Sequence, residues 1–356
     1  MVPYPHSNNK SSVFLASFAD DSERDVEAET SPFFDEDTFI AAEAPELRRK
    51  LEAQGVIVRR RKIALPVLLF FATALSTFWV GTTGWSPQDP LWDALTEGTL
   101  MPFRQVILAH WADGLTYSIC VLAILLTHEM GHFLTTLWHR IPASLPFFIP
   151  LPLFTPIGTM GAVIGMDTVR ADRRQLFDIG IAGPLAGLLI AIPITWIGVT
   201  KLDLTQAPAG AYALDLPFAM RAMMSYIRPP GYEPGKLIAA SQLNAYFMAG
   251  WVGLLITGLN MIPVSQLDGG HISYTLFGRR AVWISRIIVW GAAVYMIASL
   301  QFTWILMVAI VLFIGVKHPP TRDDRVPLGK FRVYLGLASL LIPVFCFAPR
   351  LIVFRF

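Results

Sequence analysis

Cysteine and charge are both scarce in this sequence of 356 residues. The two cysteines, Cys120 and Cys346, fall inside apolar stretches, which argues against a disulfide framework and excludes a metal site built on four thiolates. Any metal must therefore be held by histidine and carboxylate. Charged residues make up 15% of the chain and leave a net charge of +2, without one concentrated basic patch, so no nucleic-acid partner is expected.

Apolar sequence is abundant instead. Hydrophobic residues make up 54% of the chain, well above the share in an ordinary soluble domain, which predicts an all-α polytopic membrane protein. A helix needs roughly 20 apolar residues to cross a bilayer, and about seven segments approach that length. These predicted spans are 63–82, 114–138, 176–199, 240–262, 282–299, 302–316 and 331–348. A tight helical hairpin around Gln301 is expected between the fifth and the sixth.

The N-terminal segment 1–57 differs from the rest because it carries twelve acidic residues and no long apolar run. We expect a solvated, disordered cytosolic tail, with partner docking as the alternative. It lacks the basic start and apolar stretch of a secretory signal, and its acidity argues against a transit peptide. The basic run "VRRRK" at 58–62 precedes the first span, and later Lys and Arg favour the same side, which predicts a cytosolic N-terminus.

One short motif, "HEMGH" at 128–132, indicates hydrolytic metal chemistry. His128 and His132 lie about one helical turn apart, so both imidazoles can point to one metal ion. The H-E-x-x-H pattern is typical of zinc sites in which the glutamate, here Glu129, takes a proton from the attacking water. Ionisable groups inside a membrane span are costly unless they serve a function, which strengthens the catalytic interpretation.

A catalytic zinc needs a third protein ligand. The candidates by residue type are His139, Asp167, Asp172, Asp178, Asp268 and His271. His139 is on the same helix face as the motif but about 10 Å too far along the axis. Asp268 follows an apolar span that is interrupted by Pro263 and by Gly269-Gly270, and such a break can line a cavity inside the protein. Together with the HEMGH helix, this pattern favours Asp268.

Further motifs give the sequence a family resemblance. They are "GTMGAVI" at 158–164, "DIGIAGPLAG" at 178–187 and "NMIPVSQLDGG" at 260–270. With HEMGH, they follow the order and spacing of the site-2 proteases, which are intramembrane zinc metalloproteases, and the chain resembles that family over roughly 115–275. The resemblance implies one zinc ion per chain bound by His128, His132 and Asp268, with Glu129 as the base. It also implies that Asn260 donates a hydrogen bond to the oxyanion or to the substrate backbone.

Two features between these motifs complete the prediction. Segment 149–169 is rich in Pro, Gly and β-branched residues, which predicts a small β-rich re-entrant segment near the active site. Its edge could pair with an unwound substrate, or the segment could simply cap the cavity. The family often inserts a PDZ domain after the "AGP" span, but 200–239 is too short for one, so a PDZ-less type is expected. "AGPLAG" is interpreted as helix packing, and Gln266 and His271 as either support for Asp268 or exposed polar residues.

The predicted organisation has four parts. They are the acidic tail 1–57, the first transmembrane helix with an outer loop at 58–113, the catalytic core 114–275, and three C-terminal transmembrane helices at 276–356. The expected function is intramembrane zinc endopeptidase activity on transmembrane protein substrates, with membrane lipid as the surrounding partner. The alternatives are a non-catalytic metal-binding protein or transporter and a metallohydrolase of a non-peptide bond. A bacterial cytoplasmic membrane is the expected location, and a plastid membrane is the alternative.

Overall fold

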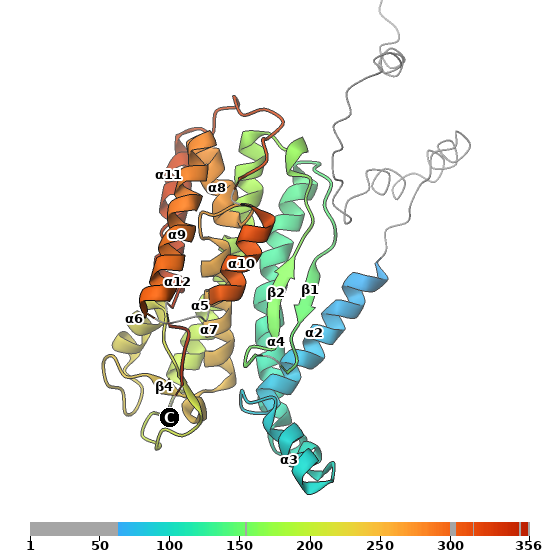
Figure 1. Cartoon of the computed structure of the whole chain (residues 1–356), viewed down its shortest axis with the longest axis vertical. Helices are drawn as coiled ribbons and strands as arrows, with labels where there is room; N and C mark the ends of the chain where they lie inside the picture. Colours follow the sequence, from blue (N-terminus) through green and yellow to red (C-terminus); the bar gives the residue numbers. More distant parts are fainter. Residues whose placement is uncertain (1–62, 154, 300–303, 316, 349, 355–356) are drawn as a thin grey trace, which may run out of the picture.

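The computed structural model describes residues 63–153, 155–299, 304–315, 317–348 and 350–354. Most of them are helical, and the long helices run roughly side by side (Figure 1). The α-helices are α2 (Ala64–Thr82), α3 (Asp89–Glu97), α4 (Met101–Trp138), α5 (Arg173–Thr200), α6 (Phe218–Ile227), α7 (Ala245–Asn260), α8 (Asp268–Phe277), α9 (Ala281–Ser299), α10 (Ile305–Ile314), α11 (Lys330–Ser339) and α12 (Ile342–Cys346). Short 3₁₀ helices are η2 (Thr168–Arg170), η3 (Ala240–Gln242) and η4 (Gly278–Arg280).

Four helical stretches in the described part are long and apolar enough to cross a membrane. They are α2, α4, α5 and the stretch Asp268–Ser299, which runs through α8, η4 and α9. The predicted fourth span is the shorter apolar helix α7, of 16 residues. The prediction of about seven spans is therefore not confirmed, although the mostly helical membrane architecture is.

The last two predicted spans are not confirmed, because their helices in the described residues are too short to cross a membrane. Helix α10 has 10 residues, so it is about 15 Å long at 1.5 Å per residue, half of the roughly 30 Å hydrocarbon core. Segment 331–348 is divided into α11 and α12, and Pro343 lies at the beginning of the second piece. Apolar composition alone did not reveal where these helices end. The predicted hairpin around Gln301 and the tail 1–57 lie outside the described residues.

Helix α4 is longer than the predicted second span. It begins at Met101 instead of 114 and extends over 38 residues. Its backbone leaves helical geometry at His110, where φ is −128° and ψ is 15°, so a kink separates the first turns from the rest. Part of the predicted outer loop is therefore helical, because it holds α3 and the beginning of α4.

The centre of the bundle is formed by α4, α5 and α7, with α2 packed on α4 and α8 on α5. Trp251 of α7 is fully buried there, and its Nε1–H donates to the backbone carbonyl of Asp215 at 3.0 Å. Many apolar side chains on the outside remain exposed, for example Leu68, Phe71 and Leu75 of α2. An apolar outer surface of this kind suits helices surrounded by lipid.

Two small sheets accompany the helices. Strands β1 (Phe147–Pro150) and β2 (Thr159–Val163) form an antiparallel pair beside α2 and α4 (Figure 1), which confirms the predicted extended segment. The second sheet has the order β4-β3-β5 and consists of β3 (Tyr212–Leu214), β4 (Ile238–Ala239) and β5 (Ile352–Phe354). Between α5 and α7 the chain thus holds β3, α6, β4 and η3, which leaves no room for a PDZ fold.

Candidate metal centre

Three predicted ligands, far apart in the sequence, meet inside the bundle. His128 and His132 come from α4, and Asp268 is the first residue of α8. The Nε2 atom of His128 lies 3.2 Å from one carboxylate oxygen of Asp268, and that of His132 lies 3.3 Å from the other. The two Nε2 atoms are 3.3 Å apart. The ligand atoms of these two buried histidines and the half-buried Asp268 are all within 4.8 Å of one another and could hold a metal ion.

The hydrogen bonding of His132 shows why a cation fits there. Its Nδ1 lies 2.8 Å from the backbone carbonyl of Ile179, to which it donates. A neutral imidazole then carries its lone pair on Nε2, the atom that faces the Asp268 carboxylate. A lone pair and a carboxylate repel unless a cation or a proton lies between them. Two imidazole nitrogens and a carboxylate are also the ligand types of catalytic zinc sites.

Helix α5 passes closely over both imidazoles. A Cβ added at Gly183 would overlap the ring of His132, and one at Gly187 would lie 3.0 Å from Nδ1 of His128. Pro184 sits between these glycines, and α5 continues through it. The "AGPLAG" motif therefore contributes close packing against the metal helix, the role that the sequence suggested for it.

Replacing Gly183 with alanine should lower both zinc content and cleavage by about tenfold or more. Alanine normally stabilises a helix interior relative to glycine by roughly 0.5–1 kcal/mol, so a loss here reports the clash with His132. Zinc per chain and turnover of a model substrate are the measurements. Gly291→Ala in α9 is the matched control, because a Cβ there meets no atom within 4 Å. Equal zinc content in both variants would contradict the close fit.

Glu129 and Asn260 lie at the same centre. Glu129 is 4% exposed, and Asn260, the last residue of α7, places Nδ2 3.4 Å from Nε2 of His128. One cavity of about 230 Å³ is bordered by all five predicted site residues. Its lining is His128, Glu129, His132, Ala162, Val163, Ile164, Gly165, Met166, Thr168, Ile179, Gly180, Asn260, Gln266, Leu267, Asp268 and His271. The structure thus brings the predicted residues together in one partly polar space.

One wall of this cavity is extended backbone. It includes the end of β2 and the residues directly after it, from Ala162 to Met166. Strand β2 pairs with β1 along one edge only, so its other edge has no strand partner in the described part of the chain. Among the hydrogen bonds of the described residues, none is donated by the Ile164 N–H. Free backbone groups therefore border the cavity.

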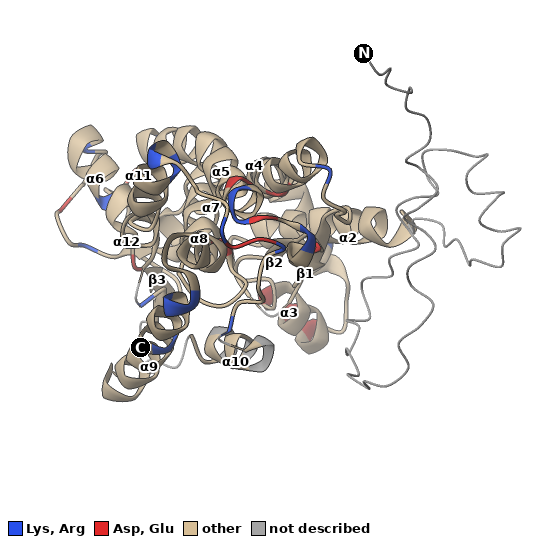
Figure 2. Cartoon of the chain, turned by 90° about the horizontal axis from the view of Figure 1, so that it is seen from above, with Lys and Arg blue, Asp and Glu red and all other residues tan. Residues whose placement is uncertain are grey.

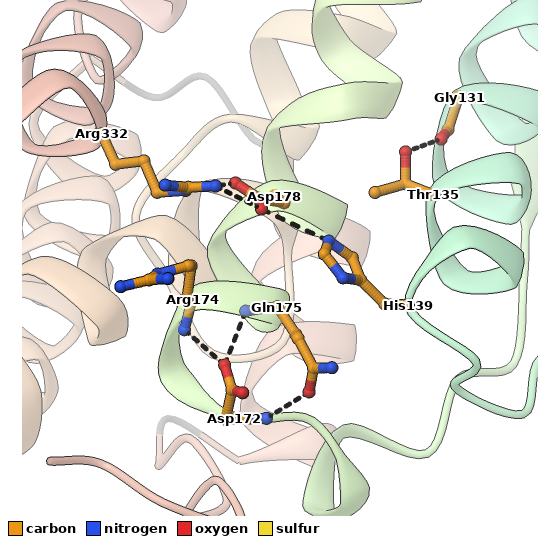
Figure 3. Close-up of polar contacts among 8 residues, drawn as sticks. All are labelled: Gly131, Thr135, His139, Asp172, Arg174, Gln175, Asp178 and Arg332. Carbon is orange, nitrogen blue, oxygen red and sulfur yellow. Dashed lines mark hydrogen bonds and ion pairs between the residues drawn. The ribbon is translucent and has the colours of Figure 1, made fainter. Parts of the chain in front are cut away.

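The rejected ligand candidates have other partners (Figure 3). His139 follows α4 and its Nε2 lies 3.3 Å from an Asp178 carboxylate oxygen. Asp178 also accepts two hydrogen bonds, at 2.6 and 2.9 Å, from Arg332 of α11. This cluster joins the end of α4 to α5 and α11. Asp178 is thus a structural carboxylate, and its partner Arg332 had no signal in the sequence.

The remaining candidates are also engaged elsewhere. Asp172 is the N-cap of α5 and accepts from the backbone N–H groups of Arg174 and Gln175, both at 2.9 Å (Figure 3). Asp167 pairs with Arg170 at 2.9 Å. His271 lines the cavity, but its Nδ1 lies 2.6 Å from Nε2 of His318. Sequence reasoning missed His318, and it missed the Ile179 carbonyl because a backbone group leaves no trace in a motif.

Comparison with known proteins identifies the family. Residues 116–306, more than half of the chain, match the family described as Peptidase family M50. The chain belongs to this family, the site-2 protease family. Among its relatives is "Probable zinc metalloprotease EGY1, chloroplastic" of Oryza sativa subsp. japonica, 34% identical over 191 residues, which are 51% of this chain and 31% of the relative.

Two relatives from Arabidopsis thaliana extend the comparison. "Probable zinc metalloprotease EGY1, chloroplastic" is 30% identical over 240 residues, which are 62% of this chain and 40% of the relative. "Probable zinc metalloprotease EGY2, chloroplastic" is 28% identical over 245 residues, 67% of this chain and 42% of the relative. The chain therefore spans less than half the length of these members of the family. Their names also fit the zinc that the donor set favours.

Proposed function

We propose that this chain is an intramembrane zinc endopeptidase that hydrolyses peptide bonds in or near transmembrane segments of other membrane proteins. The observation that carries the proposal is the convergence of the HEMGH helix, Asp268 and Asn260 on one buried cavity between apolar helices. Family membership and the names of the relatives support the same activity. Cleavage of a model transmembrane substrate by the purified chain, with bound zinc quantified, tests it.

The side chains have distinct roles in this proposal. His128, His132 and Asp268 would hold one zinc ion per chain, which supplies a Lewis acid that acidifies water and polarises the scissile carbonyl. Glu129 takes the proton from the attacking water and returns it to the leaving nitrogen. Its position beside His128 and its contact with the cavity allow both transfers. Asn260 donates its amide N–H to the oxygen on which negative charge develops.

The free backbone along the cavity explains how a helical substrate could be cut. Peptide bonds inside a helix are hydrogen-bonded internally, so a transmembrane substrate must unwind locally before it can be hydrolysed. Pairing with an exposed strand edge replaces the hydrogen bonds that unwinding removes. We assign this role to the edge that continues from β2 through Ile164, because it lies along the same cavity as the zinc ligands.

Replacing Ile164 with proline should lower kcat/KM on a transmembrane substrate by about five- to tenfold. Proline removes the N–H that has no partner within the described residues, and one hydrogen bond contributes about 1 kcal/mol. Ile164→Val keeps the N–H and serves as the control. The measurement compares a transmembrane substrate with a short unstructured peptide, whose cleavage should depend less on unwinding. Unchanged turnover of the transmembrane substrate would contradict strand pairing and favour the alternative that this segment only caps the cavity.

The membrane location follows from the four long apolar helices. The relatives above are named chloroplastic, which fits the plastid alternative and gives no support to the bacterial cytoplasmic membrane. The predicted N-terminal orientation and the division at 57, 113 and 275 stay predictions. As partners we infer transmembrane protein substrates and the surrounding lipid.

A further inference from the structure

A second polar cavity lies at the end of the bundle where α8 turns into α9. It has a volume of about 390 Å³, and its lining includes three cations, Arg279, Arg286 and Lys317. None of the three forms an ion pair with a described residue, and no described carboxylate lines the cavity. Figure 2 looks down on this end of the bundle and shows Lys and Arg on the ribbon between α8 and α9. Unpaired cations around one space favour an anionic ligand.

The other polar groups of this cavity are already engaged. Ser285 donates to the Pro263 carbonyl at 3.2 Å, and Ser265 donates to the Gly315 carbonyl. Tyr274 donates to Asp324, the neighbouring carboxylate, at 2.8 Å. Burial lowers the pKa of His318 and so disfavours its charged form. The net charge of the cavity is therefore set by the Arg and Lys side chains.

A third cavity, of about 350 Å³, has an almost entirely apolar lining. It lies between the α7–α8 connection, α9, α10 and the residue after α12. The lining residues are Ile262, Val264, Leu267, Ile288, Val289, Gly291, Ala292, Tyr295, Met296, Trp304, Val308, Val311 and Phe347. A space of this size is in the range of small-molecule sites and can hold apolar chain but no charge.

Helix α9 and the α7–α8 connection contribute different lining residues to the basic and the apolar cavity. Val282 and Ser285 line the basic cavity, and Val289, Ala292 and Met296 line the apolar one. These positions are spaced by three and four residues, so they form one stripe along α9. The stripe descends by about 10 Å from Ser285 to Ala292 at 1.5 Å per residue. The α7–α8 connection also contributes to both cavities, with Ser265 lining the basic one and Leu267 the apolar one.

We propose that these two cavities together form a binding site for an anionic phospholipid. The phosphate lies among Arg279, Arg286 and Lys317, and an acyl chain descends along α9 into the apolar cavity. Arg286 stacks 4.9 Å over the ring of Trp283, which is exposed on the outside of α9. Arginine and tryptophan together at the end of an apolar helix are typical of the level at which lipid headgroups lie.

The proposed lipid site touches the segment that carries Asp268. Leu267 lines the apolar cavity and also the cavity that holds His128, His132 and Asp268, here called the metal cavity. Asp268 follows Leu267 directly. A bound acyl chain would therefore pack against the connection that positions this carboxylate. Lipid binding itself does not rest on the proposed protease function, so the test below measures binding and not cleavage.

The test uses the full chain in detergent and two probes, dioctanoyl phosphatidic acid and inorganic phosphate, titrated by calorimetry. The head variant combines Arg279→Gln, Arg286→Gln and Lys317→Gln. Its control combines Arg280→Gln, Arg325→Gln and Lys330→Gln, which removes the same charge outside the cavity. The tail variant is Gly291→Leu, which places a larger apolar side chain at a position that lines the apolar cavity and where a Cβ meets no atom within 4 Å. Thermal unfolding without ligand checks that every variant folds.

Four results support the proposal together. The wild type should bind the lipid about tenfold or more tightly than inorganic phosphate. The head variant should weaken lipid binding by on the order of 100-fold, since each cation near a lipid phosphate contributes about fivefold. Gly291→Leu should weaken lipid binding by about tenfold and leave phosphate binding unchanged. The control should bind the lipid as the wild type does.

Other results overturn it. Equal affinity for both probes, with no effect of Gly291→Leu, would assign the basic cavity to free phosphate and leave the apolar cavity without a lipid chain. Equal losses of lipid affinity in the head variant and its control would show that the overall positive charge of the protein, and not this cavity, attracts the lipid. Binding of a model transmembrane peptide in place of the lipid, lost in Gly291→Leu, would assign the cleft to substrate.

Discussion

Replacing Glu129 with glutamine should abolish cleavage of a transmembrane substrate and leave both the fold and the zinc content unchanged. Glutamine has the shape of glutamate but cannot take a proton from water, and loss of a general base typically costs 10²- to 10⁴-fold in rate. Glu129 lines the metal cavity and is not among the grouped ligand atoms, so zinc should remain bound. We therefore expect kcat to fall by about 10³-fold. The measurements are turnover of a model transmembrane substrate in detergent and zinc per chain.

The matched control for this experiment is Glu97→Gln at the exposed end of α3, which removes one carboxylate far from the motif in sequence and outside the metal cavity. Equal cleavage by wild type and Glu129→Gln, or no zinc in either protein, would refute the proposed mechanism. Zinc without any turnover in the wild type would favour the alternative of a non-catalytic metal-binding protein or transporter. Hydrolysis of lipid but not of peptide would favour a metallohydrolase of another class of bond.

The grouping of the candidate metal ligands could be predicted from the sequence because most of its signals are local. His128, Glu129 and His132 lie within about one helical turn, so a spacing fixes their mutual geometry before any tertiary structure is known. Asp268 and Asn260 are more than 120 residues away, but they sit at a break in an apolar segment, which is visible in the sequence as Pro263 and two glycines. The structure places all of them along one cavity.

The number of spans could not be predicted in the same way. Apolar composition reports which residues avoid water, whereas the length of a helix depends on where its backbone hydrogen bonds end. Among the described residues of the apolar segment 302–316, the α-helix is the 10-residue α10, and 331–348 is divided between α11 and α12. In 331–348, the apolar residues between the two helices gave the appearance of one longer span.

Long-range polar pairs were beyond sequence reasoning for a related reason. Arg332 pairs with Asp178 across 154 positions, and His318 bonds to His271 across 47. Neither pair has a spacing rule, because tertiary packing alone brings its members together. Both involve segments near α11 or before it, outside the stretch of 115–275 on which the resemblance rested. The C-terminal part of the chain therefore packs on the core through polar contacts that no sequence motif predicts.

Replacing Asp268 with alanine should remove most of the bound zinc, and cleavage should be lost with it. Asp268 is the only described carboxylate that meets both His128 and His132, so its loss leaves two imidazoles as ligands. A catalytic zinc site normally has three protein ligands, and we expect affinity to fall by at least 100-fold. Zinc per chain after competition with a chelator is the measurement.

The control for this prediction is Asp167→Asn, which removes another carboxylate that the sequence offered as a ligand. Asp167 pairs with Arg170 and does not line the metal cavity, so zinc content and turnover should stay at the wild-type level. Asp268→Asn adds a second test, because asparagine keeps the shape of the side chain but is a weaker ligand. If Asp268→Ala and Asp268→Asn both retained zinc while Asp167→Asn lost it, the third ligand would have to be assigned elsewhere. Loss of zinc in both Asp268 variants, with thermal unfolding unchanged in Asp268→Asn, would separate ligation from packing.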